Sequence, residues 1–407
     1  MNVREKIKNV FLFLFVFLLP TQLGKHFFFS FSFVNGVRID YLAPAIYAID
    51  LVMFCLMLFY GRAIKQHISK NRRLLILFLI GFAMSIYIAP FPLMALYSIA
   101  RLCQIYIAFV IFKEEKKKSL LLIISALVAA SVFQLVLAML QFTSRGSLQG
   151  VFYFFGERFF TMSSPGIATA SLNGREILRP YGTFSHPNSL GGFFVLIYAF
   201  SLEALHTMKE KASSAIRMGL IILGAIASLM VFLSFSKAAI GTFLCITIVS
   251  GLFEFVQKPV KKATTCIPCM LSRIVIPLVL GFLFFQAKGD VYSLDKRFLL
   301  ITQSLVLFQQ YPIFGVGFGN HLYLQAQFPT PYAEFFLQPV HNIFLLILVQ
   351  GGLVFTALFS WLTIQQISKR RILIFIAIVL TGLVDHYWLS LIQNMLLIGV
   401  VFGLQEK

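Results

Sequence analysis

The sequence predicts an all-α polytopic membrane protein with about twelve transmembrane helices. Of its 407 residues, 59% are hydrophobic and only 12% are charged, which is too little charge to cover a soluble core of this size. The apolar residues gather in runs of about 15–24, each long enough to cross a hydrocarbon core. Two longer segments, 143–187 and 288–340, carry polar residues between such runs.

The apolar runs set the predicted spans, which we expect to form a single integral-membrane domain over residues 1–407. The spans are 8–23, 41–60, 74–90, 92–112, 119–142, 188–206, 217–233, 238–256, 274–287, 341–363, 372–385 and 387–404. The first run follows cationic residues but has no small-residue cleavage site. We therefore interpret it as a retained helix and not as a removed signal peptide.

Loop charge predicts how the spans are oriented. Basic loops stay in the cytoplasm, and every short loop on one side of the predicted topology is basic. These loops contain the basic residues of 62–73, 113–118, 209–217, 258–273 and 369–371. Both termini are therefore expected in the cytoplasm, in a multi-pass protein of the cytoplasmic (inner) membrane. Segments 143–187 and 288–340 then lie on the outer face, where their aromatic and aliphatic residues favour short amphipathic helices over disorder.

The net charge of +19 raises the possibility of a nucleic-acid partner. The basic residues cluster between apolar runs, however, which is the distribution that sets membrane topology. We therefore expect membrane lipids, and no nucleic acid, as binding partners. The cysteines do not form a disulfide framework, because three of the five fall inside apolar runs. The other two, Cys266 and Cys269, form a lone CxxC pair with no second pair or nearby histidine, which does not favour a metal or redox site.

Charged residues at membrane depth are costly and need a reason. Arg101 and Asp50 both fall in the middle of predicted spans. They either form a structural ion pair between helices, or Arg101 faces a water-filled cavity and supports an anionic ligand. Lys237, between two apolar runs in SFSKAAIG, is either a snorkelling lysine at the interface or a point charge for a phosphate.

The segment Arg179–Leu190 reads RPYGTFSHPNSL and is more specific. A guanidinium such as that of Arg179 offers a planar fork of donors that matches phosphate oxygens. Pro187 and Asn188 are expected to begin a helix whose free N–H groups favour a nearby anion. His186 is either a hydrogen-bond donor to a ligand or a histidine satisfied by the backbone at the helix start.

The second long segment begins its polar part with Arg297 and continues to the glycine-rich string GVGFGN at 315–320. No strand precedes this string, so a dinucleotide-binding loop is excluded, and the glycines are expected to let the loop fold closely against substrate or helix. His341 and Asn342 follow at the mouth of a predicted helix. A histidine there is able to accept a proton from a hydroxyl nucleophile, although an interfacial histidine is often only a polar boundary residue.

At this point the chain resembles the O-antigen ligase family, which includes Wzy-type polymerases and protein-directed oligosaccharide transferases. The resemblance rests on motifs in the family's order: RPYGTFSHPN, SFSKAAIG, YPIFGVGFGN and HN between 179 and 342, with GKHF at 24–27, RIDYLAP at 38–44 and DHYW at 385–388. Each motif is short, and the joint order makes the match specific. One departure is Lys237, where the family usually has arginine.

The resemblance implies a GT-C-like membrane glycosyltransferase that takes a glycan from undecaprenyl pyrophosphate and passes it to a hydroxyl of a lipid, glycan or cell-wall acceptor. It implies an inverting reaction with no metal and no cofactor. Arg179 and Arg297 would hold the donor pyrophosphate, and His341 would orient or deprotonate the acceptor. Lys237, Arg101, His186, Asn188 and Asn342 are the expected substrate-binding residues.

Several alternatives stay open within and beyond this chemistry. A ligase, a repeat-unit polymerase and a protein-directed transferase share donor handling and are barely separated by these motifs. A transporter of the same lipid-linked glycan would predict inverted repeats and a charged central path. No repeat is detectable in the sequence, so a transporter is less favoured, as is a non-catalytic scaffold.

Overall fold

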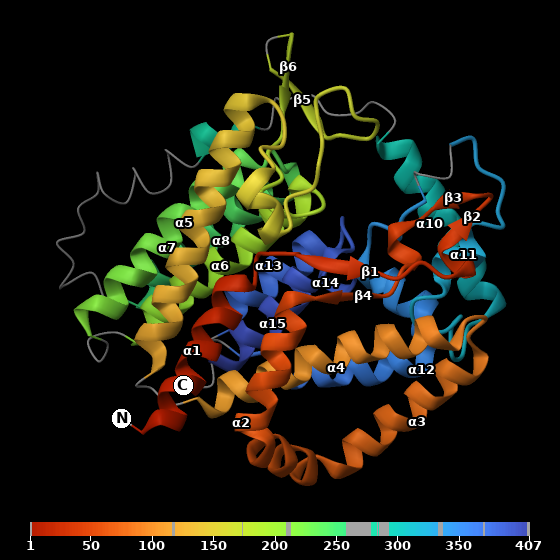
Figure 1. Ribbon diagram of the computed structural model, residues 1–407, viewed down its shortest axis with the longest axis horizontal. Coiled ribbons are helices and arrows are strands. Elements are labelled where there is room, and N and C mark those ends of the chain that lie inside the picture. Colours follow the sequence, from red (N-terminus) through yellow and green to blue (C-terminus); the bar gives the residue numbers. More distant parts are fainter. Residues whose placement is uncertain are drawn as a thin grey trace. The chain divides into compact units, whose positions relative to one another are not determined.

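The computed structural model describes residues 2–115, 119–172, 174–208, 213–257, 278–282, 284, 293–332, 337–368 and 371–404. It is mostly helical, at 72%, and it divides into two compact units. The first unit is Met1–Ser119, Val291–Ile367 and Gly382–Lys407, and the second is Leu120–Asp290 and Ser368–Thr381. The chain colours of Figure 1 follow these segments from the red N-terminus to the blue C-terminus.

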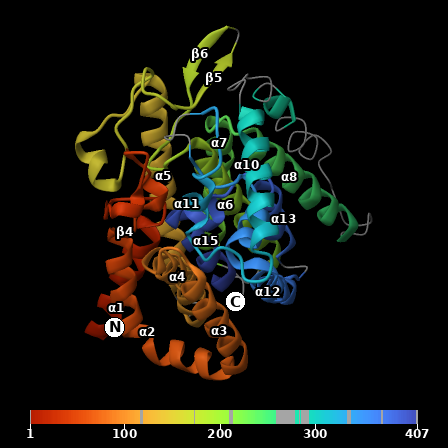
Figure 2. The ribbon, with the colours of Figure 1, turned by 90° about the vertical axis from the view of Figure 1, so that its right-hand side faces the viewer.

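The first unit is built on the long helix α4, which packs against α15, α2 and α3. Its helices are α1 (Val3–Leu18), α2 (Ala48–Lys70), α3 (Arg72–Ile88), α4 (Pro92–Glu114), α10 (Ser293–Gln310), α11 (His321–Gln325), α12 (Ile343–Gln366), α14 (Tyr387–Ser390) and α15 (Ile392–Leu404). Gly399 and Gly403 stand one turn apart on α15, and a side chain at either would meet the α4 backbone. Such a small-xxx-small pattern lets two apolar helices approach closely. Figure 2 shows α10 beside α12, the pair that leads to the site described below.

Short antiparallel ribbons accompany the helices, and the mostly helical content is consistent with the expected all-α membrane protein. In the first unit, β1 (Gly24–His26) pairs with β4 (Ala45–Tyr47), and β2 (Phe33–Val34) pairs with β3 (Val37–Arg38). The β2–β3 turn is Asn35-Gly36, and both residues have positive φ. An Asn-Gly pair is favoured there because a two-residue type I′ turn needs this backbone and matches the twist of the strands.

The second unit is centred on α6, which packs against both α7 and α8. Its helices are α5 (Leu120–Ser144), α6 (Pro187–Met208), α7 (Ser214–Leu233), α8 (Lys237–Gln257) and α13 (Ile372–Gly382). Helix α13 belongs to this unit as far as Thr381. Segment 143–187 holds a 3-10 helix, η4 (Gly150–Phe155), and the hairpin of β5 (Thr169–Leu172) with β6 (Arg175–Leu178). Segment 143–187 thus contains a short helix and a hairpin, and segment 288–340 contains α10 and α11; the amphipathic character expected of these helices stays a prediction.

The helices support a multi-pass membrane protein. Within the described residues, five are long and apolar enough to cross a bilayer, namely α4, α5, α7, α12 and residues Pro187–Thr207 of α6. Helices α2 and α3 would add a sixth span if counted as one, although they are bent by 89°. Helices α13 and α15 have 11 and 13 residues, fewer than the roughly 20 that span a bilayer directly. The predicted number of twelve stays a prediction; most of 274–287, and the CxxC pair, lie outside the described residues.

Helix α12 is broken in its middle, and the glycine-rich loop repairs the break. Gly352 has a φ of 64°, which ends the regular helix there. The loop amides of Val316 and Gly317 donate to the carbonyls of Val349 and Gln350, at 2.9 and 3.1 Å. Two amides after the break donate in turn to loop carbonyls. Irregular backbone within a membrane helix requires such partners, so the expected close approach of the glycines is to a helix.

Candidate active site

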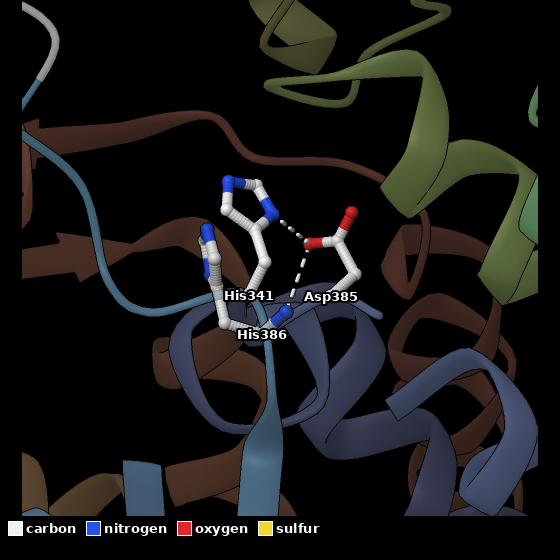
Figure 3. A group of neighbouring side chains, drawn as sticks. All are labelled: His341, Asp385 and His386. Atoms are coloured by element: carbon white, nitrogen blue, oxygen red, sulfur yellow. Dashed lines mark hydrogen bonds and ion pairs between the residues drawn. The ribbon is translucent and has the colours of Figure 1, made fainter. Parts of the chain in front are cut away.

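His341, Asp385 and His386 meet in the first unit, and we call them the histidine cluster (Figure 3). His341 Nδ1 lies 3.6 Å from Asp385 Oδ1, and both side chains are largely buried, at 13% and 9% exposure. This separation is too long for a hydrogen bond, and catalytic contacts often tighten only when substrate binds. Figure 3 shows the second ring nitrogen of His341 turned away from the carboxylate. The ring is thus oriented as a base would be, with its carboxylate behind it.

Two predicted residues hold the backbone that carries Asp385. Asn342 caps α12 by accepting from the amides of Phe344 and Leu345, each at 3.0 Å. The Asn342 side-chain amide also donates to the Leu383 carbonyl at 3.2 Å. Arg297 Nη1 donates to the Val384 carbonyl at 3.0 Å. These bonds connect the start of α12 and α10 to the two residues before Asp385, so both side chains position the cluster.

The Asp385 carboxylate and the His386 ring are also fixed locally. Asp385 Oδ1 accepts from the His386 amide at 2.8 Å, and His386 Nδ1 lies 2.6 Å from Ser390 Oγ. Burial lowers the pKa of His386 to about 3; the Asp385 carboxylate opposes this, and His341 and Arg297 add to it. His386 is therefore neutral near pH 7, and its ring packs 5.0 Å from that of His341, centroid to centroid.

A third buried histidine lies close to this cluster. Burial lowers the pKa of His321 to about 3, and the neighbouring His386 lowers it further. His321 Nδ1 lies 2.8 Å from the amide nitrogen of Gln350, which sits at the break in α12. The glycine-rich loop thereby positions a second neutral imidazole beside the first. Of these three histidines, His341 is the least buried.

The cluster suits proton transfer, and its donor set also fits a cation. Its ligand atoms lie within 4.8 Å of one another and could hold a metal ion. Two imidazoles and one carboxylate are suitable ligands for a divalent transition metal. One of these nitrogens already contacts a hydroxyl, at Ser390. A chelator should leave acid–base chemistry at this cluster unaffected, whereas it should abolish chemistry that depends on a bound metal.

The second unit gathers a different set of predicted residues around Arg179. Arg179 Nε donates to the Ser234 carbonyl at 3.0 Å, and its Nη2 donates to Asn188 Oδ1 at 2.6 Å. The Asn188 amide donates to His186 Nδ1 at 3.1 Å, which is the backbone-satisfied arrangement considered for that histidine. Two contacts in different directions fix the plane of the guanidinium, as a bidentate phosphate binder requires.

Arg158 is a further cation of this group that the sequence motifs did not reveal. Its guanidinium donates to the Ser185 carbonyl at 3.1 Å. Burial raises the pKa of Tyr181, while Arg179 and Arg158 both lower it, which places both charges near one phenol. Lys237 begins α8 three residues after Ser234 and is exposed. We call Arg179, Asn188, His186 and Arg158 the arginine cluster.

Arg101 forms the ion pair that was one of its two expected roles. Its guanidinium donates to both carboxylate oxygens of Asp50, at 2.6 and 3.0 Å, and to Gln104 at 2.8 Å. The rings of Tyr47 and Tyr97 lie 5.2 and 4.9 Å from its charge. The group is largely buried, and both of its terminal nitrogens are engaged in structure, so its substrate-binding role stays a prediction without support from these contacts.

Part of the chain, from just after the arginine cluster to within α12, is similar to a known protein family. Residues 189–360 match the family model described as O-antigen ligase, which confirms the resemblance seen in the motifs. The match includes Lys237, Arg297 and His341. No curated protein matches the chain.

Proposed function

We propose that this protein is a membrane glycosyltransferase that moves a glycan from undecaprenyl pyrophosphate to a hydroxyl of a lipid, glycan or cell-wall acceptor. The observation that carries the proposal is His341, an imidazole inside the segment that matches the O-antigen ligase family, with the carboxylate of Asp385 behind it. The family and the apolar helices support a glycosyltransferase-like membrane enzyme; the donor, acceptor and mechanism are our proposal.

His341 acts as the general base in this mechanism. The acceptor hydroxyl loses its proton to the ring nitrogen facing away from Asp385, while its oxygen forms the new bond to the anomeric carbon. The bond from that carbon to the pyrophosphate oxygen breaks, and its electron pair leaves with undecaprenyl pyrophosphate. Asp385 stabilises the imidazolium that forms. Attack opposite the leaving group inverts the anomeric centre.

The arginines act on the leaving group. A pyrophosphate gains negative charge as the sugar departs, and preorganised guanidinium groups stabilise that charge without reorganising. Arg179 is held in place by Ser234 and Asn188, and Arg297 by the Val384 carbonyl. We assign donor binding to both, and a supporting charge to Lys237. A pyrophosphate already leaves well, so no glycosidase-type carboxylate pair is needed.

The reaction is proposed at the outer face of the cytoplasmic membrane, with both termini in the cytoplasm. The positive-inside distribution of basic loops supports this orientation. A repeat-unit polymerase is the second candidate, since the family resemblance implies the same donor handling for both activities. In that case the acceptor hydroxyl belongs to another lipid-linked glycan.

Purified protein in lipid nanodiscs, supplied with undecaprenyl-pyrophosphate-linked glycan and an acceptor, tests the proposal. We expect release of undecaprenyl pyrophosphate together with glycan on the acceptor. Arg179→Ala, Arg297→Ala and His341→Ala variants should lose this turnover, and Arg145→Ala, an exposed cation of the second unit, should keep it. Full turnover by the three site variants would refute the assignment.

A further inference from the structure

A pocket of about 250 Å³ opens in the first unit, and its lining includes none of the residues assigned above. Its volume is roughly eight times the about 30 Å³ that a water molecule takes up in the liquid. That is too large for one ion or water, and it is below the range of about 300–1,000 Å³ typical of drug-sized ligands. The pocket therefore has room for one compact ring and not for an extended chain.

In the lining of the pocket, amide side chains make up four of the seven polar residues, and the other seven residues are apolar. Its polar residues include Gln303 on α10, Gln325 on α11, Gln338 before the cluster and Asn35 at the β2–β3 turn. An amide both donates and accepts hydrogen bonds, as does the hydroxyl group of a sugar. Among the described lining residues, Lys296 carries the only charge, and it lies 5.4 Å from the centre of the Tyr332 ring. Several amides beside an aromatic ring and aliphatic side chains suit a ring that carries hydroxyl groups on apolar carbons, as a sugar does.

Gln325 is the most telling of these amides. It is 2% exposed, and neither its amide nitrogen nor its amide oxygen has a hydrogen-bond partner within the described structure. A buried polar group without a partner costs free energy, and most native structures avoid it. Both atoms are buried, so a ligand in the pocket would supply their partners once the Gln325 side chain turns into the cavity that it lines.

Three chain segments connect the pocket to the histidine cluster. Lys296 precedes Arg297, whose guanidinium holds the Val384 carbonyl. Gln325 lies one turn after His321 on α11. The pocket residues Val34 and Leu337 pack in the same apolar group as Tyr41, whose ring meets His386 edge-on at 5.6 Å. A ligand in the pocket is thus adjacent in structure to the residues proposed for catalysis.

We infer that this pocket binds a single sugar residue of one of the two substrates, with Gln325, Gln303 and Gln338 reading its hydroxyl groups. This inference rests on the proposed function, because it names a specificity subsite for the same reaction. The sugar belongs either to the lipid-linked donor or to the acceptor. Both present the same chemistry to the amides, and the experiment separates them.

The test compares Gln325→Leu and Gln303→Leu with Gln309→Leu, a matched control at an exposed position of α10. KM and kcat are measured against donor at saturating acceptor and against acceptor at saturating donor. Loss of two neutral hydrogen bonds should raise KM for one substrate roughly tenfold, and that substrate carries the sugar. Thermal stability in detergent should not fall for Gln325→Leu, because no internal hydrogen bond is lost.

Gln338→Ala, at a half-buried position in a loop, keeps the test decisive if the core variants fail to fold. Unchanged KM values for both substrates in the folded pocket variants would overturn the inference. If the wild-type protein shows no transfer at all, the proposed function fails by itself. Saturation-transfer NMR with glucose, galactose, rhamnose and N-acetylglucosamine then decides on the pocket alone. Sugar signals that vanish in Gln325→Leu and persist in Gln309→Leu support it, and their absence from the wild type contradicts it.

Discussion

Replacing Asp385 by asparagine isolates the charge behind the proposed base. Asparagine keeps an oxygen that can accept from the His386 amide, as Asp385 Oδ1 does at 2.8 Å, so the local backbone should survive. What is lost is the negative charge 3.6 Å from His341 Nδ1. That charge matters when His341 has taken the acceptor proton, because an imidazolium then faces the carboxylate.

The size of the effect follows from Coulomb's law at this separation. At 3.6 Å the attraction is about 4.6 kcal/mol for an effective dielectric constant of about 20 and about 1.2 kcal/mol in bulk water. These values correspond to roughly 2,000-fold and roughly sevenfold in rate. Both side chains are less than a sixth exposed, which favours the upper part of this range. We expect kcat to fall roughly 100- to 1,000-fold.

The assay follows release of undecaprenyl pyrophosphate by purified Asp385→Asn. Asp40→Asn, which neutralises an exposed carboxylate of the same unit, serves as the control and should turn over normally. In a His341→Ala background, Asp385→Asn should add little, because residues that act as a unit are not additive. A kcat within about twofold of wild type for folded Asp385→Asn would refute the reasoning.

The remaining predictions concern acid, backbone, ion pairing and metal. In the unfolded chain a histidine takes up a proton near pH 6.5, whereas the buried His386 takes one up only near pH 3. The free energy of unfolding should therefore decrease as the pH is lowered across this window, by up to about 1.4 kcal/mol per pH unit for this residue. In His386→Asn, melting temperatures measured in detergent should depend less on pH. Gly352→Ala should destabilise the protein strongly, since its φ is positive and its Cβ would fall on a carbonyl of the glycine-rich loop, whereas Gly61→Ala has open space and should be neutral or stabilising. Glu115→Gln should cost about 3 kcal/mol in a denaturation assay, because it removes the buried charge partner of Lys8 at 3.0 Å and leaves only the more exposed Glu5 at 3.8 Å. An unchanged denaturation midpoint would show that this ion pair does not contribute to stability. Dialysis against EDTA should leave turnover unchanged. If EDTA instead abolished turnover and only a divalent cation restored it, the histidine cluster would be a metal-binding site.

Much of the helical layout follows from hydropathy alone. Apolar runs predicted helices at the places where α4, α5, α6, α7 and α12 lie, because a run of such length is read the same way in any context. The strands were not predictable in this manner. Each ribbon has only two to four residues per strand, which is shorter than the alternation needed to recognise a strand. The Asn35-Gly36 turn was the usable signal for one of them.

The candidate site was likewise predictable from the sequence only in part. Single residues with unusual chemistry in motifs, such as Arg179 and His341, were identifiable from the chain. Their partners required the fold, since the DHYW motif alone does not show that Asp385 faces a histidine 44 positions earlier, and Arg158 lies in no motif. The break in α12 was also hidden, because two adjacent glycines in an apolar run do not reveal that a distant loop satisfies the backbone between them.

The anomeric configuration of the product tests the central claim most directly. The acceptor oxygen is proposed to attack opposite the pyrophosphate in one step while His341 takes its proton. NMR of the glycan before and after transfer by the wild-type enzyme should therefore show inversion at the transferred sugar, and His341→Ala should form almost no product. Retention of configuration, or full product formation by His341→Ala, would contradict the account.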